Sequence, residues 1–169
     1  IREVDALVHV VRCFEDENIM HVDGSVDSVR DIETLDLELI FADMETVEKR
    51  LQKVSKTIKS DKSLQGELEL LTRFKEQLDE GLPGKKLELT EEEAKLSRSF
   101  NLLSDKPVIY ALNIGEDDLA DEGAGNPHVA KVMDYARAEG AEAFVICAKI
   151  EEEIAQFDED EREAFLNDL

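Results

Sequence analysis

The chain has 169 residues, of which 42 are acidic and 20 are basic, so its formal net charge is -22. Hydrophobic residues make up 42% of it, which excludes wholesale disorder, and no run of about 18 apolar residues is available to span a membrane. Cys13 and Cys147 form no CxxC-type spacing and are expected to be free thiols. Free thiols and the lack of a recognisable leader sequence predict a cytoplasmic location. A first residue other than Met predicts that the chain is a fragment.

Three short apolar runs predict β-strands of a parallel sheet. They are residues 4–11 (VDALVHVV), 107–112 (PVIYAL) and 143–147 (AFVIC). Nearly continuous apolar character is typical of strands that are covered on both faces. His9 lies inside the first run, where we expect a core side chain.

A helix is expected between the second and third strands. Asn126 is a suitable N-cap, Pro127 suits the first turn, and Gly140 can end the helix. A crossover of this length joins parallel strands, so residues 1–28 and 104–169 are expected to form one α/β unit.

The middle of the chain, residues 29–103, has a helical pattern. Ser28 with Asp31 resembles a capping box, and a helix is expected to follow to about Ser60. A second amphipathic segment and a third, which Thr90 opens, come after it. The break at 61–63 is short, so the first two helices are expected to fold back as an antiparallel coiled-coil arm. The expected seam of the first helix consists of Leu37, Ile40, Met44, Val47, Leu51, Val54 and Ile58.

The arm is electrically balanced, although the protein is acidic. Residues 43–99 contain 13 acids and 12 bases, and the segment 49–62 holds six bases and one acid. Such a stretch is either a solvated helix face or a surface that seeks phosphate groups. The sequence leaves both interpretations open.

Polar residues follow two of the predicted strands. Asn113 comes after the second strand and Ala148-Lys149 after the third. Ligands of open α/β sheets bind at the carboxyl ends of strands, and a carboxamide suits the N6 and N7 edge of adenine. A backbone amide and the aliphatic part of the Lys149 side chain could line the pocket around the base. These features predict a nucleotide site, although an N-x-x-E tetrapeptide is common by chance.

Phosphate-binding and metal-binding motifs are absent from the sequence. The glycine-rich segment 81–86 lacks the G-x-x-x-x-G-K-[ST] spacing, and no HExxH, GxSxG or Cys/His metal motif occurs. His21 belongs to a loop after a strand, from which an imidazole could reach a reacting water. A loop histidine is more often a plain surface residue.

In the identity and order of these features, the chain resembles the Obg-like ATPases of the YchF family. The resemblance is carried by the opening segment 1–31, the helix start at 35–44, N-x-x-E at 113–116 and Cys-Ala-Lys at 147–149. It implies part of a P-loop NTPase (G-domain) sheet interrupted by the helical arm. It also implies that the phosphate loop and a C-terminal TGS domain belong to parts of the family protein that this chain does not contain.

The resemblance also implies roles for particular residues. In guanine-specific relatives the base motif is N-K-x-D, whereas here Ile114 and Glu116 replace its lysine and aspartate. The family accordingly prefers ATP, with Mg²⁺ ligands expected upstream. By resemblance, His21 is the water-positioning residue, and the residues around the base are Asn113, Ile114, Glu116, Cys147, Ala148 and Lys149.

Two functions are expected. The first is an ATPase acting with the ribosome, in which the arm contacts the large subunit or ribosomal RNA. This segment alone is predicted to be inactive. The second is a helical interaction module that docks on ribosomal RNA or protein without catalysis. Neither involves a membrane or sequence-specific DNA. Self-association through the arm is a third alternative.

Overall fold

The computed structural model describes residues 3–15 and 26–158, and these form two compact units. The sheet unit contains Val8–Ile32 and Val108–Leu169, and the helical unit contains Ile1–Leu7 and Glu33–Pro107. The sequence had placed the arm at 29–103, so each observed boundary lies a few residues later in the chain. His21 lies outside the described residues.

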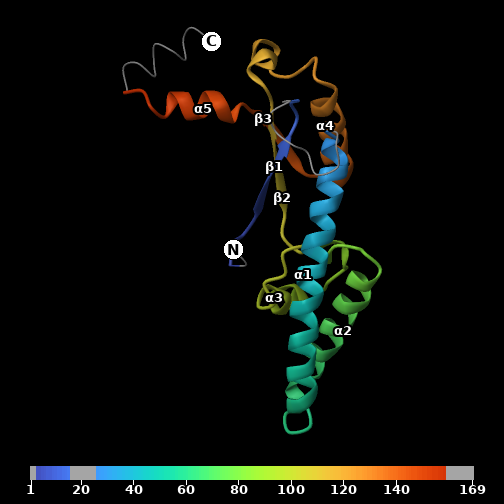
Figure 1. The fold of residues 1–169 in the computed structure, drawn as a ribbon. Coiled ribbons are helices and arrows are strands. Elements are labelled where there is room, and N and C mark those ends of the chain that lie inside the picture. Colours follow the sequence, from blue (N-terminus) through green and yellow to red (C-terminus); the bar gives the residue numbers. More distant parts are fainter. Residues whose placement is uncertain (1–2, 16–25, 159–169) are drawn as a thin grey trace. The chain divides into compact units, whose positions relative to one another are not determined.

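The sheet unit is built on a three-stranded parallel sheet in the order β1-β2-β3, with β1 at Leu7–Arg12, β2 at Val108–Asn113 and β3 at Glu142–Ile146 (Figure 1). β2 and β3 pair in register from Ile109 with Glu142 to Asn113 with Ile146. β1 runs in the same direction as β2, since its first residue donates to the carbonyl of Pro107 and Cys13 donates to that of Asn113. The predicted α/β parallel sheet is therefore confirmed.

The connection between β2 and β3 contains the 3₁₀ helix η3 (Glu116–Asp121) and the helix α4 (Pro127–Glu139), and α5 (Ala148–Ile154) follows β3. The side chain of Asn126 caps α4 by accepting from the backbone N–H groups of His128 and Val129. Gly140 ends the helix at a φ of 67°, a conformation that glycine adopts without strain. The predicted cap, first-turn proline and terminating glycine of this helix are all confirmed.

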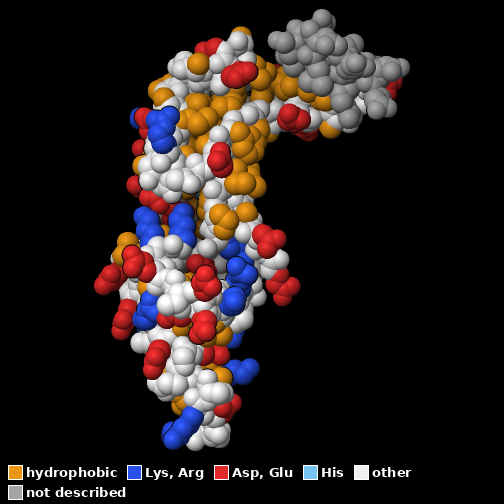
Figure 2. All heavy atoms as spheres, turned by 180° about the vertical axis from the view of Figure 1, so that it is seen from behind, with side chains coloured by type: hydrophobic (Ala, Val, Ile, Leu, Met, Phe, Trp, Pro, Cys, Tyr) orange, Lys and Arg blue, Asp and Glu red, His pale blue; other side chains and the backbone are white. Residues whose placement is uncertain are grey.

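The core of the sheet unit lies on one face of the sheet, where Val129, Val132 and Ala136 of α4 pack with Tyr110 and Leu112 of β2. The predicted burial of β1 on both faces is wrong for the described residues. Val8 and Val10 are 60% and 58% exposed, because their side chains alternate with those that face the core. Hydrophobic side chains accordingly reach the surface of this unit (Figure 2). His9, expected in the core, is half-buried beside the ring of Tyr110.

The helical unit is formed by α1 (Ser28–Thr57), whose first turn belongs to the sheet unit, followed by α2 (Gln65–Asp79) and α3 (Glu91–Arg98). The short 3₁₀ helices η1 (Lys62–Leu64) and η2 (Gly84–Lys86) lie before and after α2. The chain reverses at η1, and α2 returns along α1 (Figure 1). The predicted antiparallel helical pair is thus present. Its core contains Ile40, Val47, Val54, Leu70, Leu71, Phe74, Leu78, Phe100 and Leu102.

Two predicted details of α1 are wrong. Asp27, rather than Ser28, caps the helix, because its carboxylate accepts from the N–H of Arg30 at 3.2 Å. The Ser28 hydroxyl instead donates to the carbonyl oxygen of Arg12 at 2.7 Å. The apolar seam begins at Ile40, since the side chain of Leu37 is 47% exposed. The prediction that Thr90 opens the third helix is confirmed, and the structure shows a reciprocal capping box between Thr90 and Glu93 at the start of α3.

Candidate functional site

The carboxyl ends of β2 and β3 meet at one edge of the sheet unit. Asn113 is the last residue of β2 and pairs with Ile146, the last residue of β3. One residue further on, the N–H of Ile114 donates to the carbonyl oxygen of Ile146 at 2.9 Å. The two loops that follow these strands therefore start side by side, at the edge where parallel sheets bind their ligands.

A side-chain hydrogen bond joins the two loops. The Oδ1 atom of Asn113 accepts from the backbone N–H of Ala148 at 2.9 Å. This bond fixes the rotamer of Asn113, and it directs the NH₂ group of the carboxamide away from Ala148. The structure thus brings together two of the residues that the sequence predicted to surround a base.

An ion pair links the same loops a second time. Lys149 Nζ donates to Glu116 Oε2, and the hydrogen bond, followed by the charge of this carboxylate, raises the pKa of Lys149 above its usual value. Both side chains remain accessible, at 64% for Lys149 and 41% for Glu116. Solvent screens such a pair, so it orients the two side chains more than it stabilises the fold.

Two of the residues that were predicted to surround the base have side chains buried in the core instead. Ile114 is 2% exposed and Cys147 is 5% exposed, and both belong to the hydrophobic core of the sheet unit. In this structure the side chain of Ile114 therefore does not lie where a base could pack on it. Its apolar character favours the interior, where it packs close to Gly123.

A cavity of about 330 Å³ lies beside this edge, between the residues after β1 and the start of α4. Asn126 organises its wall, because its Nδ2 atom donates to the carbonyl oxygen of Cys13 at 2.6 Å and to Asp118 Oδ2 at 2.7 Å. From the sequence, Asn126 was predicted only as a helix cap. Its contact with Cys13 crosses 113 positions of sequence, which no local pattern could reveal.

No metal centre is found among the described residues, since they contain no group of three His, Cys, Asp or Glu side chains that could hold an ion. His21, predicted to position a water, cannot be placed because it lies outside these residues. None of the helices that the structure describes is both long and apolar enough to cross a bilayer.

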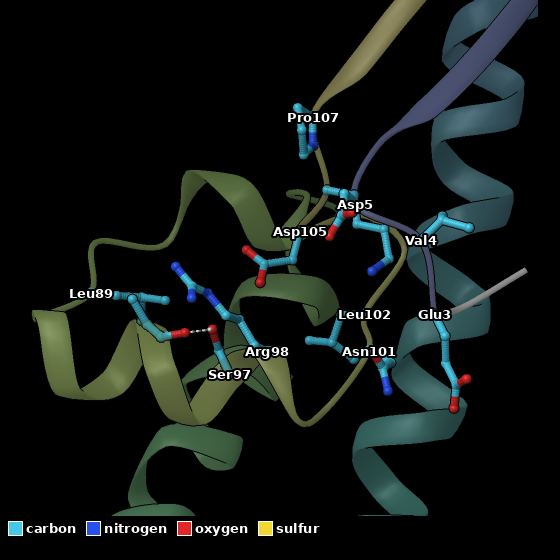
Figure 3. Close-up of a pocket in the computed structure, with 12 residues that line it drawn as sticks. Glu3, Val4, Asp5, Leu89, Ser97, Arg98, Asn101, Leu102, Asp105 and Pro107 are labelled. Atoms are coloured by element: carbon cyan, nitrogen blue, oxygen red, sulfur yellow. Dashed lines mark hydrogen bonds between the residues drawn. The ribbon is translucent and has the colours of Figure 1, made fainter.

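The helical unit has a cavity of about 470 Å³, which is lined by Asp5, Arg98 and Asp105 among other residues (Figure 3). Burial, followed by the nearby charge of Asp43, raises the pKa of Asp105. Asp43 is fully buried and was not predicted from the sequence as a core residue. A signal for it existed, because an acidic residue between Ile40 and Val47 interrupts the apolar side of α1.

A second hollow of the helical unit, of about 590 Å³, lies along the basic part of α1 and is lined by Lys49, Arg50 and Lys53. Arg50 is held by Glu67 at 2.6 Å and lies over the ring of Phe100. Lys49 pairs with Glu45 on its own helix at 2.5 Å, where both side chains are largely exposed. Lys49 and Lys53 are accordingly more open to an external ligand than Arg50, the third cation of this hollow.

Comparisons with known proteins agree with the fold. No protein-family model matches the chain. The whole chain is 51% identical over 170 residues to the ribosome-binding ATPase YchF of Bacillus subtilis (strain 168), and 38% identical to the protein of the same name from Haemophilus influenzae. The structure of the Schizosaccharomyces pombe YchF GTPase matches 99% of the chain with a TM-score of 0.78 and 29% identity.

The chain spans 46% of the length of each of these three proteins. The similarity extends from one end of the chain to the other and includes both the interrupted sheet and the inserted helices. At this level of identity and structural agreement, the whole chain is similar to one part of the YchF proteins.

Proposed function

We propose that the protein containing this chain binds and hydrolyses ATP and acts together with the ribosome in the cytoplasm. The bacterial relatives are named ribosome-binding ATPases, and the fission-yeast relative is called a GTPase. The observation that carries the proposal is the hydrogen bond between Asn113 and Ala148. It holds the loops after two neighbouring strands together, so that both can contact one planar ligand. The nucleotide base is the ligand whose edge suits a fixed carboxamide.

In this proposal the chain contributes base recognition. The NH₂ group of Asn113 donates to N7 of the purine, and the apolar stem of Lys149 covers one side of the ring. His21 orients the attacking water for in-line displacement at the γ-phosphate. Mg²⁺ would neutralise the phosphate charge in such a reaction, but the described residues offer no ligand set for it, so we assign it to no residue of this chain.

The test is a titration of the full-length protein with ADP and GDP, comparing wild type with Asn113→Ala. We expect Asn113→Ala to weaken ADP binding about tenfold, the effect of losing roughly one hydrogen bond. Gln156→Ala removes an exposed amide from the same unit and should leave binding unchanged. Equal affinity of the Asn113→Ala variant and wild type would refute the base site.

A second candidate function is docking of the helical arm on ribosomal RNA, with the large subunit as the expected contact. It is favoured by the hollow that Lys49 and Lys53 line. Basic side chains bind the phosphate backbone by releasing counterions, so such binding weakens steeply as salt rises. The arm would then act as an interaction module whether or not the sheet unit binds a nucleotide.

A salt series of ribosome co-sedimentation tests this function. Reversing the charge at Lys49, Lys53 and Lys56 should weaken binding at least about tenfold and make its salt dependence shallower. Reversal at Lys95 and Lys131, which lie on other exposed helix faces, serves as the comparison. Binding that is indifferent to both salt and the triple change would exclude the arm as an RNA-docking surface.

A further inference from the structure

Adenine and guanine differ in the groups that a pocket must satisfy. Guanine carries an O6 acceptor and the N1–H and N2–H donors, whereas adenine carries an N6 donor and an unprotonated N1. Both bases share the N7 acceptor. A guanine site therefore needs a free N–H group for O6 and a free carboxylate for N1–H and N2–H, while a donor to N7 serves either base.

The sheet unit has both guanine-reading groups, but each already has a partner within the protein. The N–H of Ala148 donates to Asn113 Oδ1 at 2.9 Å. The carboxylate of Glu116 accepts from Lys149 Nζ. These two bonds cross between the same two loops, so both guanine-reading groups are engaged before any base arrives.

Asn113 does not discriminate between the bases in this arrangement. Its Oδ1 atom is committed to Ala148, which leaves its NH₂ group to donate to the shared N7 acceptor. Beyond the engaged N–H of Ala148, discrimination can come from the far edge of the base, where the carboxylate of Glu116 is the acceptor that guanine would require.

We propose that Lys149 is a specificity-determining residue, which keeps guanine out by holding the carboxylate of Glu116 in an ion pair. The inference rests on the proposed nucleotide site. Guanine must compete with Lys149 for the Glu116 carboxylate to gain its two hydrogen bonds, whereas adenine, which has no donor there, leaves the pair undisturbed. A base lying over the pair would remove water from it and strengthen it, and this increases the penalty for guanine.

The experiment measures the ADP and GDP affinities of the full-length protein by calorimetric titration. Lys149→Met keeps an unbranched apolar stem and removes the ammonium group. We expect it to tighten GDP binding at least about fivefold, at the low end of the discrimination given by one bidentate contact, and to change ADP binding less than about twofold. Lys149→Arg retains the cation and should keep the wild-type ratio.

Two further variants make the result specific. Lys131→Met is the same substitution on the exposed face of α4 and should leave both affinities unchanged. Adding Glu116→Gln to Lys149→Met should abolish the gain in GDP affinity, because the freed carboxylate is the group that guanine uses. Thermal melts of each variant establish that it is folded.

The outcomes separate this inference from the function on which it rests. If Lys149→Met binds ADP normally and shows the wild-type preference against GDP, the role of Lys149 is refuted and the nucleotide site stands. An equal loss of both affinities would show that Lys149 only covers the ring, which also refutes it. If the wild-type protein binds neither nucleotide, the proposed function fails, and this inference fails with it.

Discussion

The buried carboxylate of Asp43 binds the backbone at Ser104, accepting from its N–H at 2.6 Å through Oδ2. The other oxygen accepts from the N–H of Leu103 at 2.8 Å. One side chain of α1 thus satisfies two backbone groups that lie 60 and 61 positions later in the sequence. These hydrogen bonds connect α1 to the last residues of the helical unit, just before Pro107.

Asp43→Ala should destabilise the helical unit strongly. It leaves two N–H groups without their acceptor in a site that water does not reach, at a cost of about 2 to 4 kcal/mol in the free energy of unfolding. Chemical denaturation measures this value. Glu38→Ala on an exposed position of the same helix should change it by less than about 0.5 kcal/mol. Similar values for the two variants would contradict the assigned role of Asp43.

Asp105 should make the stability of this unit depend on pH. Its pKa is raised above the ordinary 3.8, first by burial and then by the charge of Asp43. A carboxyl with a raised pKa in the folded state stabilises the protein below its unfolded pKa, and this contribution is lost as pH rises through the folded pKa. Asp105→Asn, which needs no proton to remain neutral, should therefore melt higher than wild type at pH 7.

We expect the gain from Asp105→Asn to be about 2 °C at pH 7 and to shrink as pH falls toward 4. Thermal melts of wild type and variant between these pH values provide the measurement. Asp79→Asn alters an exposed carboxylate of α2 that pairs with Lys75 and should produce no gain at neutral pH. A gain for Asp105→Asn that grows on acidification would have the wrong sign for this explanation.

Asn126 should be the most sensitive polar residue of the sheet unit. Asn126→Ala removes the cap of α4 together with the donor to Cys13 and Asp118, at a cost of about 2 to 3 kcal/mol. Asn126→Ser restores a capping oxygen without the amide donor, and we expect it to recover about 1 kcal/mol. Denaturant unfolding of the three proteins separates the cap from the long-range contact; identical stability of Ala and Ser would deny the capping contribution.

The 169-residue chain by itself should hydrolyse no ATP. It carries no G-x-x-x-x-G-K-[ST] motif, so nothing in it is expected to cradle the phosphates. Phosphate release from the purified chain should equal that of a blank, and His21→Ala should not alter it. Turnover that persists through purification and disappears in His21→Ala would overturn this expectation.

The local sequence determined the elements of this fold and their order. Strand runs, the Asn126 cap, Gly140 and the Thr90 capping box depend on neighbouring residues, and each was predictable because its physical cause lies within a few positions. The order of motifs also carried the resemblance to the YchF family. It placed Asn113 and Ala148 at strand ends, from which their meeting follows if the strands are adjacent.

Only the tertiary structure decided which groups are engaged and which are buried. Three contacts join segments that are distant in sequence: the bond between Asn113 and Ala148, the pair of Glu116 with Lys149, and the bonds from Leu103 and Ser104 to Asp43. Local patterns could not reveal that Asp27 outcompetes Ser28 as a cap, because the Ser28 hydroxyl is drawn to the end of β1. The sequence determines where polar groups stand along the chain, but hydrogen bonds depend on distance in space, which packing alone determines.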